Sequence, residues 1–298
     1  PANMIRRAIH YAGEVDPRFG TPDAPRILPY VYLPFTGFMM RPLTALPFAE
    51  SVGAFQVVNH LCLIGGVLLA VWAVGWWEPR RDLWPAAIAV LALALNMTVF
   101  RQNNAGQLNA VLVFGMALLF TSIVRGWHPA AVGFIAAFLM LFKLSPGIFL
   151  IWFLLRREWK RAAWMVGWAL ALTALTVGIY GLQVHLDFLP VLKNMGYGTS
   201  TWEQFGNTFW RDPYNQSPNA LFHRLLVNKE GSGVTPWLSL SPAIANALTW
   251  LVSLAVLGVF GWATWSGRQH EGRTALAGSF SLAICASLLL PSIMWDHY

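Results

Sequence analysis

The stretch that decides the fold is RQNNAGQLN, residues Arg101–Asn109. Almost wholly apolar runs lie on both sides of it, at Trp84–Phe100 and Ala110–Val124. A turn that only reverses the chain between two membrane helices needs a glycine, an asparagine and little more. This turn carries five amide side chains and an arginine. Two questions follow. The first is on which side of the membrane this turn lies, and the second is which other groups lie close to it there.

The composition around this turn is that of a polytopic membrane protein. The 298 residues are 56% hydrophobic and only 11% charged, whereas soluble domains average roughly 25% charged residues. The 16 Trp and 7 Tyr residues fit aromatic belts at the two membrane interfaces. The net charge of +7 comes from Lys and Arg in short loops between apolar runs. Such loops orient a membrane protein and do not indicate a nucleic-acid partner.

Several kinds of chemistry have no motif in this sequence. Cys62 and Cys285 lie inside apolar runs, which predicts small buried side chains and no disulfide framework. There is no Walker motif and no cluster of His, Cys and carboxylates at metal-ligand spacing. We therefore expect no cofactor, no metal site and no ATP-driven transport.

Hydrophobic runs predict the membrane helices. Spanning a bilayer takes about 20 apolar residues in a helix. Six runs fit, of which the second and third are slightly short: Val52–Trp76, Trp84–Phe100, Leu108–Val124, Ala162–Gly181, Pro242–Trp265 and Thr274–Leu290. A seventh run, Ala130–Leu155, is interrupted by Lys143-Leu144-Ser145-Pro146, which predicts two half-length helices in a re-entrant hairpin. Pro29–Glu50 holds four prolines and predicts an interfacial or re-entrant segment.

These runs predict one all-α transmembrane domain over residues 1–298, with about eight membrane helices or half-helices. We expect an extracytoplasmic or interfacial segment at 1–50 and a helix bundle with the hairpin at 51–181. An extracytoplasmic loop at 182–241 and C-terminal helices at 242–298 complete it. Because the sequence starts at Pro1 without Met and stops at Tyr298 inside a polar motif, we expect a fragment truncated at both ends.

Basic residues predict the orientation. Four short loops carry them, and the positive-inside rule places all four in the cytoplasm: Arg80-Arg81, Arg125, Arg156–Arg161, and Arg268 with Arg273. Alternation then places the Arg101–Asn109 turn, the 182–241 loop and the terminal Asp296-His297 outside, and directs Lys143 toward that same face. A single span at Ala130–Leu155 would put Arg156–Arg161 outside, and the basic cluster argues against it. We expect an integral protein of the plasma (inner) membrane whose active face is extracytoplasmic.

The polar turn and Lys143 each have a structural and a functional interpretation. The amides can cap the following helix, through Asn103 or Asn104, and bond between helices, or they can bind a hydroxyl-rich or phosphate-bearing ligand with Arg101. Lys143 can extend its ammonium to the interface. However, a charge inside a membrane run costs about 2.5–3.5 kcal/mol on insertion scales, which makes a functional role the default.

Two later segments carry further candidates. Asn215 and Gln216 lie in the 182–241 loop with several Trp residues, where amides can bond sugar hydroxyls; alternatively the loop lies on the bilayer as part of an aromatic belt. Asp296 and His297 follow the last apolar run. They can act as general acid or base, or hold a phosphate or a metal, or simply form an interfacial polar pair that ends a helix.

Four motifs occur in a fixed order: Gly106-Gln107-Leu108-Asn109, Lys143-Leu144-Ser145-Pro146, Asn215-Gln216-Ser217 and Trp295-Asp296-His297-Tyr298. Together they resemble the polyprenol-phosphate-mannose-dependent integral-membrane glycosyltransferases, glycosyltransferase family 87, from about Tyr30 to Tyr298. The resemblance implies a GT-C fold with an extracytoplasmic active site. It implies a polyprenyl-phosphate sugar donor, classically mannose, and an inverting transfer to a lipid or glycan acceptor.

The resemblance also implies roles for residues. Asp296 and His297 would lie at the reacting centre, and Lys143 and Arg101 near the donor phosphate. The amides Asn103, Gln107, Asn109, Asn215 and Gln216 would surround donor or acceptor. The base of such enzymes is typically an Asp in the first extracytoplasmic loop. We do not transfer that role to Asp16, which lies late in that loop, so the expected Asp would precede Pro1.

Two other functions stay open at the level of the sequence. A lipid-linked sugar transporter or flippase would explain the broken helix and the charge within the membrane. Its weakness is that the cytoplasmic loops are short and have little room for a second access site. The other alternative is a non-catalytic membrane subunit of an envelope-glycan assembly. The sequence does not distinguish the sugar or the acceptor.

Overall fold

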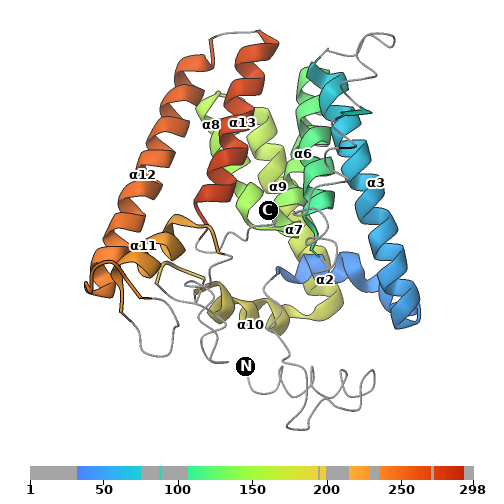
Figure 1. The fold of residues 1–298 in the computed structure, drawn as a ribbon. Helices are drawn as coiled ribbons and strands as arrows, with labels where there is room; N and C mark the ends of the chain where they lie inside the picture. Colours follow the sequence, from blue (N-terminus) through green and yellow to red (C-terminus); the bar gives the residue numbers. More distant parts are fainter. Residues whose placement is uncertain are drawn as a thin grey trace.

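The structure is a computed structural model that describes residues 32–74, 87–88, 91, 107–193, 195–198, 215–228, 235–269 and 272–291. These residues form helices that stand side by side, with shorter helices across one end of the bundle (Figure 1). In the described part, three helices are long and apolar enough to cross a membrane: α3 (Phe48–Val74), α9 (Trp159–Tyr180) and α12 (Pro242–Gly267). The all-α polytopic membrane fold expected from the apolar runs is therefore confirmed.

Shorter apolar helices complete the bundle. They are α6 (Asn109–Val124), α7 (Pro129–Phe142), α8 (Ile148–Leu155) and α13 (Arg273–Leu289). The helices begin within a few residues of the predicted runs, and α3 starts four residues earlier than Val52. The expected span Trp84–Phe100 lies outside the described residues, apart from Ala87, Ile88 and Leu91, which are helical.

The interruption predicted after α7 is a true break in the helix. Lys143 leaves the helix with an extended backbone, at φ −149° and ψ 132°, and a 3₁₀ turn, η2 (Ser145–Gly147), leads into α8. Pro146 has no N–H for the carbonyl of Phe142, which a continued helix would require. The hydroxyl of Thr36 donates to that carbonyl at 2.8 Å instead. The break is thus stabilised by a residue from a distant part of the chain.

The chain also reverses its direction at this break. Phe142 ends α7 beside the start of α6, where Lys143 bonds Asn109. Farther on, Phe149 packs on Phe280 with ring centroids 4.7 Å apart, and Phe280 packs on Phe120 at 5.1 Å. Phe120 lies about three turns beyond Asn109 on α6. The helix α8 therefore runs back along the bundle, opposite to α7.

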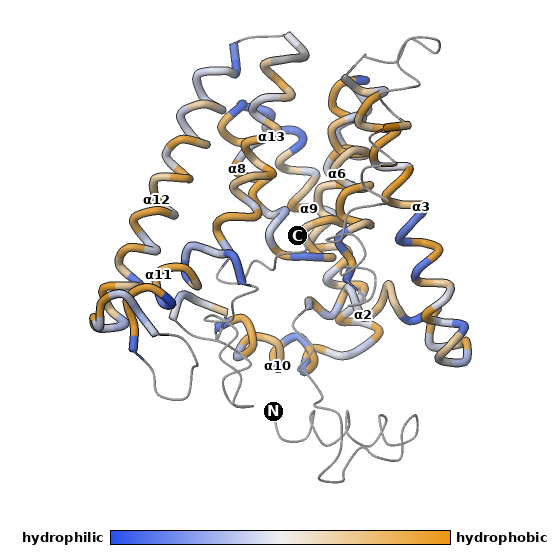
Figure 2. Tube along the Cα trace, viewed as in Figure 1, coloured by the Kyte–Doolittle hydropathy of each residue, from blue (hydrophilic) through white to orange (hydrophobic). Residues whose placement is uncertain are grey.

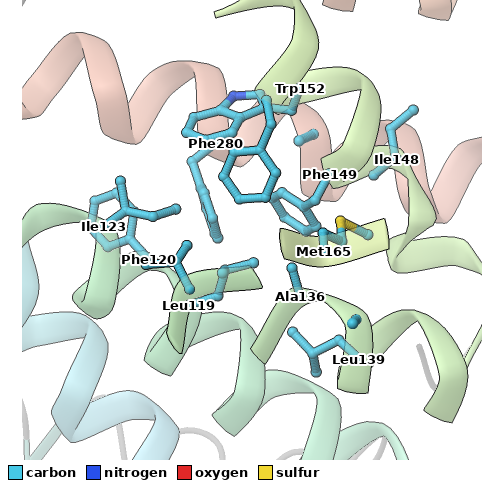
Figure 3. Close-up of a cluster of buried hydrophobic side chains, with 14 of the residues drawn as sticks. Leu119, Phe120, Ile123, Ala136, Leu139, Ile148, Phe149, Trp152, Met165 and Phe280 are labelled. Atoms are coloured by element: carbon cyan, nitrogen blue, oxygen red, sulfur yellow. The ribbon is translucent and has the colours of Figure 1, made fainter. Parts of the chain in front are cut away.

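An aromatic core holds the two sides of the bundle together. Figure 3 shows Phe280 of α13 beside Phe149 and Trp152 of α8, with Phe120 of α6 next to them. Trp152 and Phe149 are fully buried. Figure 1 shows α12 and α13 on one side of this core, α3 and α6 on the other, and the remaining long helices between them. This core fixes how α13 faces α6.

The basic residues of three described loops, after α6, α8 and α12, gather at one end of the bundle. The Arg125 guanidinium lies 3.8 Å from the Trp72 ring centroid, which joins the last turns of α6 and α3. Arg157, after α8, lies 5.3 Å from the ring of Trp265, near the end of α12. Glu158 pairs with both Arg156 and Arg161. Figure 2 shows hydrophilic stretches at this same end of the apolar helices.

The opposite end carries short helices that lie across the bundle (Figure 1). They are α2 (Pro34–Met40), the 3₁₀ turn η1 (Arg41–Ala45), α10 (Leu182–Lys193) and α11 (Pro218–Leu226). Helices α10 and α11 lie within 182–241, the segment predicted as an extracytoplasmic loop, for which the sequence predicted no helices. Gly181, with φ 83°, ends α9 in a conformation that favours glycine, and the chain continues as a second helix, α10, rather than as coil.

Candidate functional site

Two residues that are 34 positions apart meet where α6 begins and α7 ends. Lys143 Nζ donates to Asn109 Oδ1 at 3.1 Å. Asn109 is the first residue of α6 and is 8% exposed, while Lys143 is half-buried. The carbonyl end of α7 favours a cation at this position, because helix dipoles are negative at their C-termini. The structure thus brings together two of the candidate site residues.

The amide of Asn109 has a second polar atom. Its Nδ2 is buried and has no hydrogen-bond partner within the described chain. A buried donor without an acceptor costs about 1–3 kcal/mol, so such a group indicates a missing acceptor. The ammonium of Lys143 adds positive charge a few ångströms away. An ammonium and an amide N–H side by side form a donor set suited to an anion.

Gln107, the next candidate, is held from two sides. Tyr32 Oη donates to Gln107 Oε1 at 3.1 Å, and Asn59 Nδ2 donates to the Gln107 carbonyl at 3.2 Å. Burial raises the pKa of the Tyr32 phenol, so it stays protonated and able to donate. These bonds fix the last residues of the polar turn against α3. Leu108 is the N-cap of α6 and no side chain in the described part of the chain caps the helix there, a position for which the structural interpretation of the turn had allowed Asn103 or Asn104.

Sequence reasoning missed Tyr32, Thr36 and Asn59. Asn59 is fully buried in the middle of an apolar run, and an amide in such a place is a signal of the same kind as Lys143. That signal was enough to find it. Tyr32 and Thr36 have no comparable signal, because a Tyr and a Thr at a membrane interface are ordinary.

A cavity of about 400 Å³ opens beside the Lys143–Asn109 pair. Helices α3, α6 and α13 and the turn η2 form its walls. Its polar end holds Asn109, Lys143 and Ser145, and most of the remaining lining is apolar. Among the described residues that line it, none is a carboxylate or a His. Within the described residues, the cavity lining offers a cation, one amide and several hydroxyls, but no base.

The motif Asn215-Gln216-Ser217 forms the start of α11. Asn215 Oδ1 accepts from the Ser217 N–H at 3.1 Å, and Ser217 Oγ accepts from the Ala220 N–H at 3.2 Å, which makes Ser217 the N-cap. Arg224 donates to the Asn215 carbonyl at 2.6 Å. Asn215 is fully buried and Gln216 is exposed. The described bonds of Asn215 shape the local backbone and do not reach Lys143.

A short turn at 195–198 links this motif to α13. The Gly198 N–H donates to Asn219 Oδ1 at 3.0 Å, within α11. Tyr197 Oη donates to the Leu290 carbonyl at 2.7 Å, just after α13. The last turns of α13 also bring Ser287 and Leu288 to the cavity. The end of α13 therefore borders both the cavity and the turn that supports α11.

Four predicted site residues lie outside the described residues: Arg101, Asn103, Asp296 and His297. Their assignments stay predictions. In the part of the chain that the structure describes, no group of three or more His, Cys, Asp or Glu residues could hold a metal ion.

Comparison with known proteins adds independent information. Residues 30–291 match the sequence model of glycosyltransferase family 87. The chain is 24% identical to the polyprenol-phosphate-mannose-dependent alpha-(1-2)-phosphatidylinositol mannoside mannosyltransferase of Mycobacterium tuberculosis, and 23% identical to the protein of the same name from Mycolicibacterium smegmatis. Each alignment covers 91% of this chain and 59% of the relative, so the chain spans less than two thirds of either length. No solved structure matches the chain.

Proposed function

The chain belongs to glycosyltransferase family 87, and from this membership we propose that it transfers mannose from a polyprenyl-phosphate donor to a lipid or glycan acceptor. The two relatives are named for a polyprenol-phosphate-mannose donor and a phosphatidylinositol mannoside acceptor, which makes these the first candidates to test. The observation that carries the proposal is the Lys143–Asn109 pair at the polar end of an apolar cavity.

Lys143 and Asn109 suit the donor phosphate. As the bond from the anomeric carbon to the phosphate oxygen breaks, negative charge grows on the departing polyprenyl phosphate. A fixed ammonium and an amide N–H near that oxygen stabilise the charge as it develops. Arg101 is a second cation for this phosphate in our proposal. The amides of Gln107, Asn103, Asn215 and Gln216 would bond hydroxyls of the sugar or the acceptor.

The acceptor hydroxyl must lose a proton as it attacks the anomeric carbon opposite the phosphate. We propose Asp296 or His297 for this step, or an Asp in another part of the full-length protein. Chain reach supports the first choice. Asp296 is five residues beyond Pro291, which an extended chain covers in at most about 18 Å, and the preceding Ser287 and Leu288 already line the cavity.

We assign the Lys143 end of the bundle to the extracytoplasmic face. The basic loops that the structure describes lie at the other end, and basic loops face the cytoplasm in membrane proteins. A lipid-phosphate donor fits this face, because its chain can stay in the membrane while its head group enters the site. The plasma membrane is the membrane that we propose for it.

The test uses the full-length protein in proteoliposomes with radiolabelled polyprenyl-phosphate mannose and phosphatidylinositol mannoside. We expect label in the acceptor lipid, and a loss of at least about 100-fold in rate for Lys143→Ala, the size of effect seen when a charge-stabilising group is removed. Lys160→Ala is the matched control, because Lys160 is exposed at the basic end of the bundle, and it should keep the wild-type rate.

Three results would contradict the proposal. The first is the absence of transfer from this donor to any glycolipid or glycan acceptor. The second is movement of the intact donor across the bilayer without transfer, which would indicate a transporter. The third is equal rates for Lys143→Ala and Lys160→Ala, which would remove Lys143 from the site.

A further inference from the structure

We infer that the cavity between α3, α6 and α13 holds the first part of the donor's hydrocarbon chain, with the donor phosphate at its Lys143 end. The inference rests on the proposed function, since it names which substrate occupies the cavity and in which direction. If the inference holds, the residues of the cavity walls help to determine which donor the protein accepts, together with the polar residues.

The distribution of polarity along the cavity gives the direction. Lys143 and Asn109 lie at the end where α6 begins. Phe120, about three turns along α6, and Phe280 of α13 line the other end, and the two rings contact each other there. A ligand that fills this space has an anionic head and an apolar body. That combination describes a lipid phosphate, and neither a free sugar nor a nucleotide sugar.

The chemistry of the two substrates favours the donor over the acceptor. In a polyprenyl-phosphate sugar, one phosphate bonds both the anomeric carbon and the lipid chain. The chain therefore begins within a few bonds of the reacting centre. In a glycolipid acceptor, whole sugar units can separate the attacking hydroxyl from the lipid. A cavity that starts at the phosphate-binding residues is where the donor chain must go.

The walls keep the cavity open because they are built from small residues at rigid contacts. Gly66 and Ala70 of α3 and Ala277 and Ser281 of α13 line the space. At Gly66, α3 lies so close to α6 that an added Cβ would stand 3.1 Å from the Phe114 backbone. The two helices are thus fixed against each other. Apolar cavities smaller than this one stay dry and bind small hydrocarbons, so this cavity is suited to an apolar ligand.

The test compares two donors, one with a full-length polyprenyl chain and one shortened to two isoprene units. Ala277→Phe fills the end of the cavity far from Lys143. It should raise KM for the long donor at least about tenfold, because changes of one methylene in such pockets already cost about 10–200-fold. KM for the short donor should stay within about twofold of wild type. Ala174→Phe is the matched control, since Ala174 is exposed on α9, and it should leave both values unchanged.

Equal KM values for Ala277→Phe and wild type with the long donor would overturn the inference, and so would an equal rise for both donors. A photoreactive polyprenyl phosphate, with its reactive group on the second isoprene unit, provides a readout that needs no transfer and no variant. Label on α6 or α13 peptides at the cavity supports the inference, and label confined to exposed surfaces such as α12 contradicts it. If the wild-type protein transfers mannose from neither donor, the proposed function fails. The photolabelling still shows whether polyprenyl phosphate occupies the cavity.

Discussion

At the scale of single residues, the site depends on polar groups that the fold holds in apolar surroundings. Lys143 is placed by the break at Pro146 and by the bond from Thr36 to the end of α7. Gln107 is placed by Asn59 and Tyr32. Of these, Asn59 is fully buried, and its Oδ1 has no partner among the described residues. We regard Asn59 as a positioning residue that acts through Gln107.

Replacing Asn59 by Leu should affect transfer more than stability. Hydrogen bonds between membrane helices average about 0.6 kcal/mol, so thermal unfolding should change little. A displacement of about 1 Å in a positioned group can reduce a rate about 100-fold, and we expect kcat/KM to fall by at least about tenfold. His60→Leu is the control, because His60 is exposed on the same helix and bonds the Gln56 carbonyl.

The contrast between the two variants decides this assignment. If Asn59→Leu lowers the unfolding temperature strongly and activity only in proportion, Asn59 is merely structural. If Asn59→Gln restores part of the activity that Asn59→Leu loses, the amide donor itself is what the Gln107 carbonyl requires.

At the scale of elements, the reversal between α7 and α8 controls which end of the bundle carries each later segment. Because α8 runs back along the bundle, Arg157 lies at the same end as Arg125 and Arg268. A continuous helix from α7 to α8 would place Arg157 at the opposite end. The orientation of everything after Leu155 therefore follows from one break of a few residues.

Cysteine labelling in intact cells tests this reversal. Arg157→Cys should react with a membrane-impermeant thiol reagent only after the membrane is opened. Gln216→Cys, at the start of α11, should react from outside, because Gln216 is exposed and lies at the other end. Labelling of Arg157→Cys from outside would contradict the hairpin. The native Cys62 and Cys285 are replaced by Ala in the parent protein to remove background.

At the scale of the whole molecule, the sequence predicted the long elements better than their meeting points. Apolar runs of membrane length and the Lys143–Pro146 interruption predicted α3, α6, α9, α12, α13 and the break, because each depends on local composition. The contact of Lys143 with Asn109 depends on how α7 returns to α6, which no local pattern specifies. Helices α10 and α11 were missed because short interfacial helices have the mixed composition of loops.

The residues of the candidate site also differ in how much of their role the sequence alone could predict. Lys143, Asn109 and Gln107 were recognisable as polar residues in apolar surroundings; the structure joins Lys143 to Asn109 and bonds Gln107 to Tyr32 and Asn59. Asn215 and Gln216 were grouped with them from the resemblance, whereas the described bonds of Asn215 form the start of α11. The cavity itself could not be predicted, since residues of three helices that are distant in the sequence, α3, α6 and α13, line it together.

The central claim is that Lys143 forms the phosphate end of a lipid-phosphate cavity, and binding of the reaction's lipid product tests it most directly. The measurement is the Kd of polyprenyl phosphate for the full-length protein in nanodiscs. Lys143→Met should raise this Kd at least about tenfold, or about 1.4 kcal/mol, Lys143→Arg should restore part of the loss, and Lys160→Met should match wild type. Equal Kd values for wild type and Lys143→Met would contradict the account.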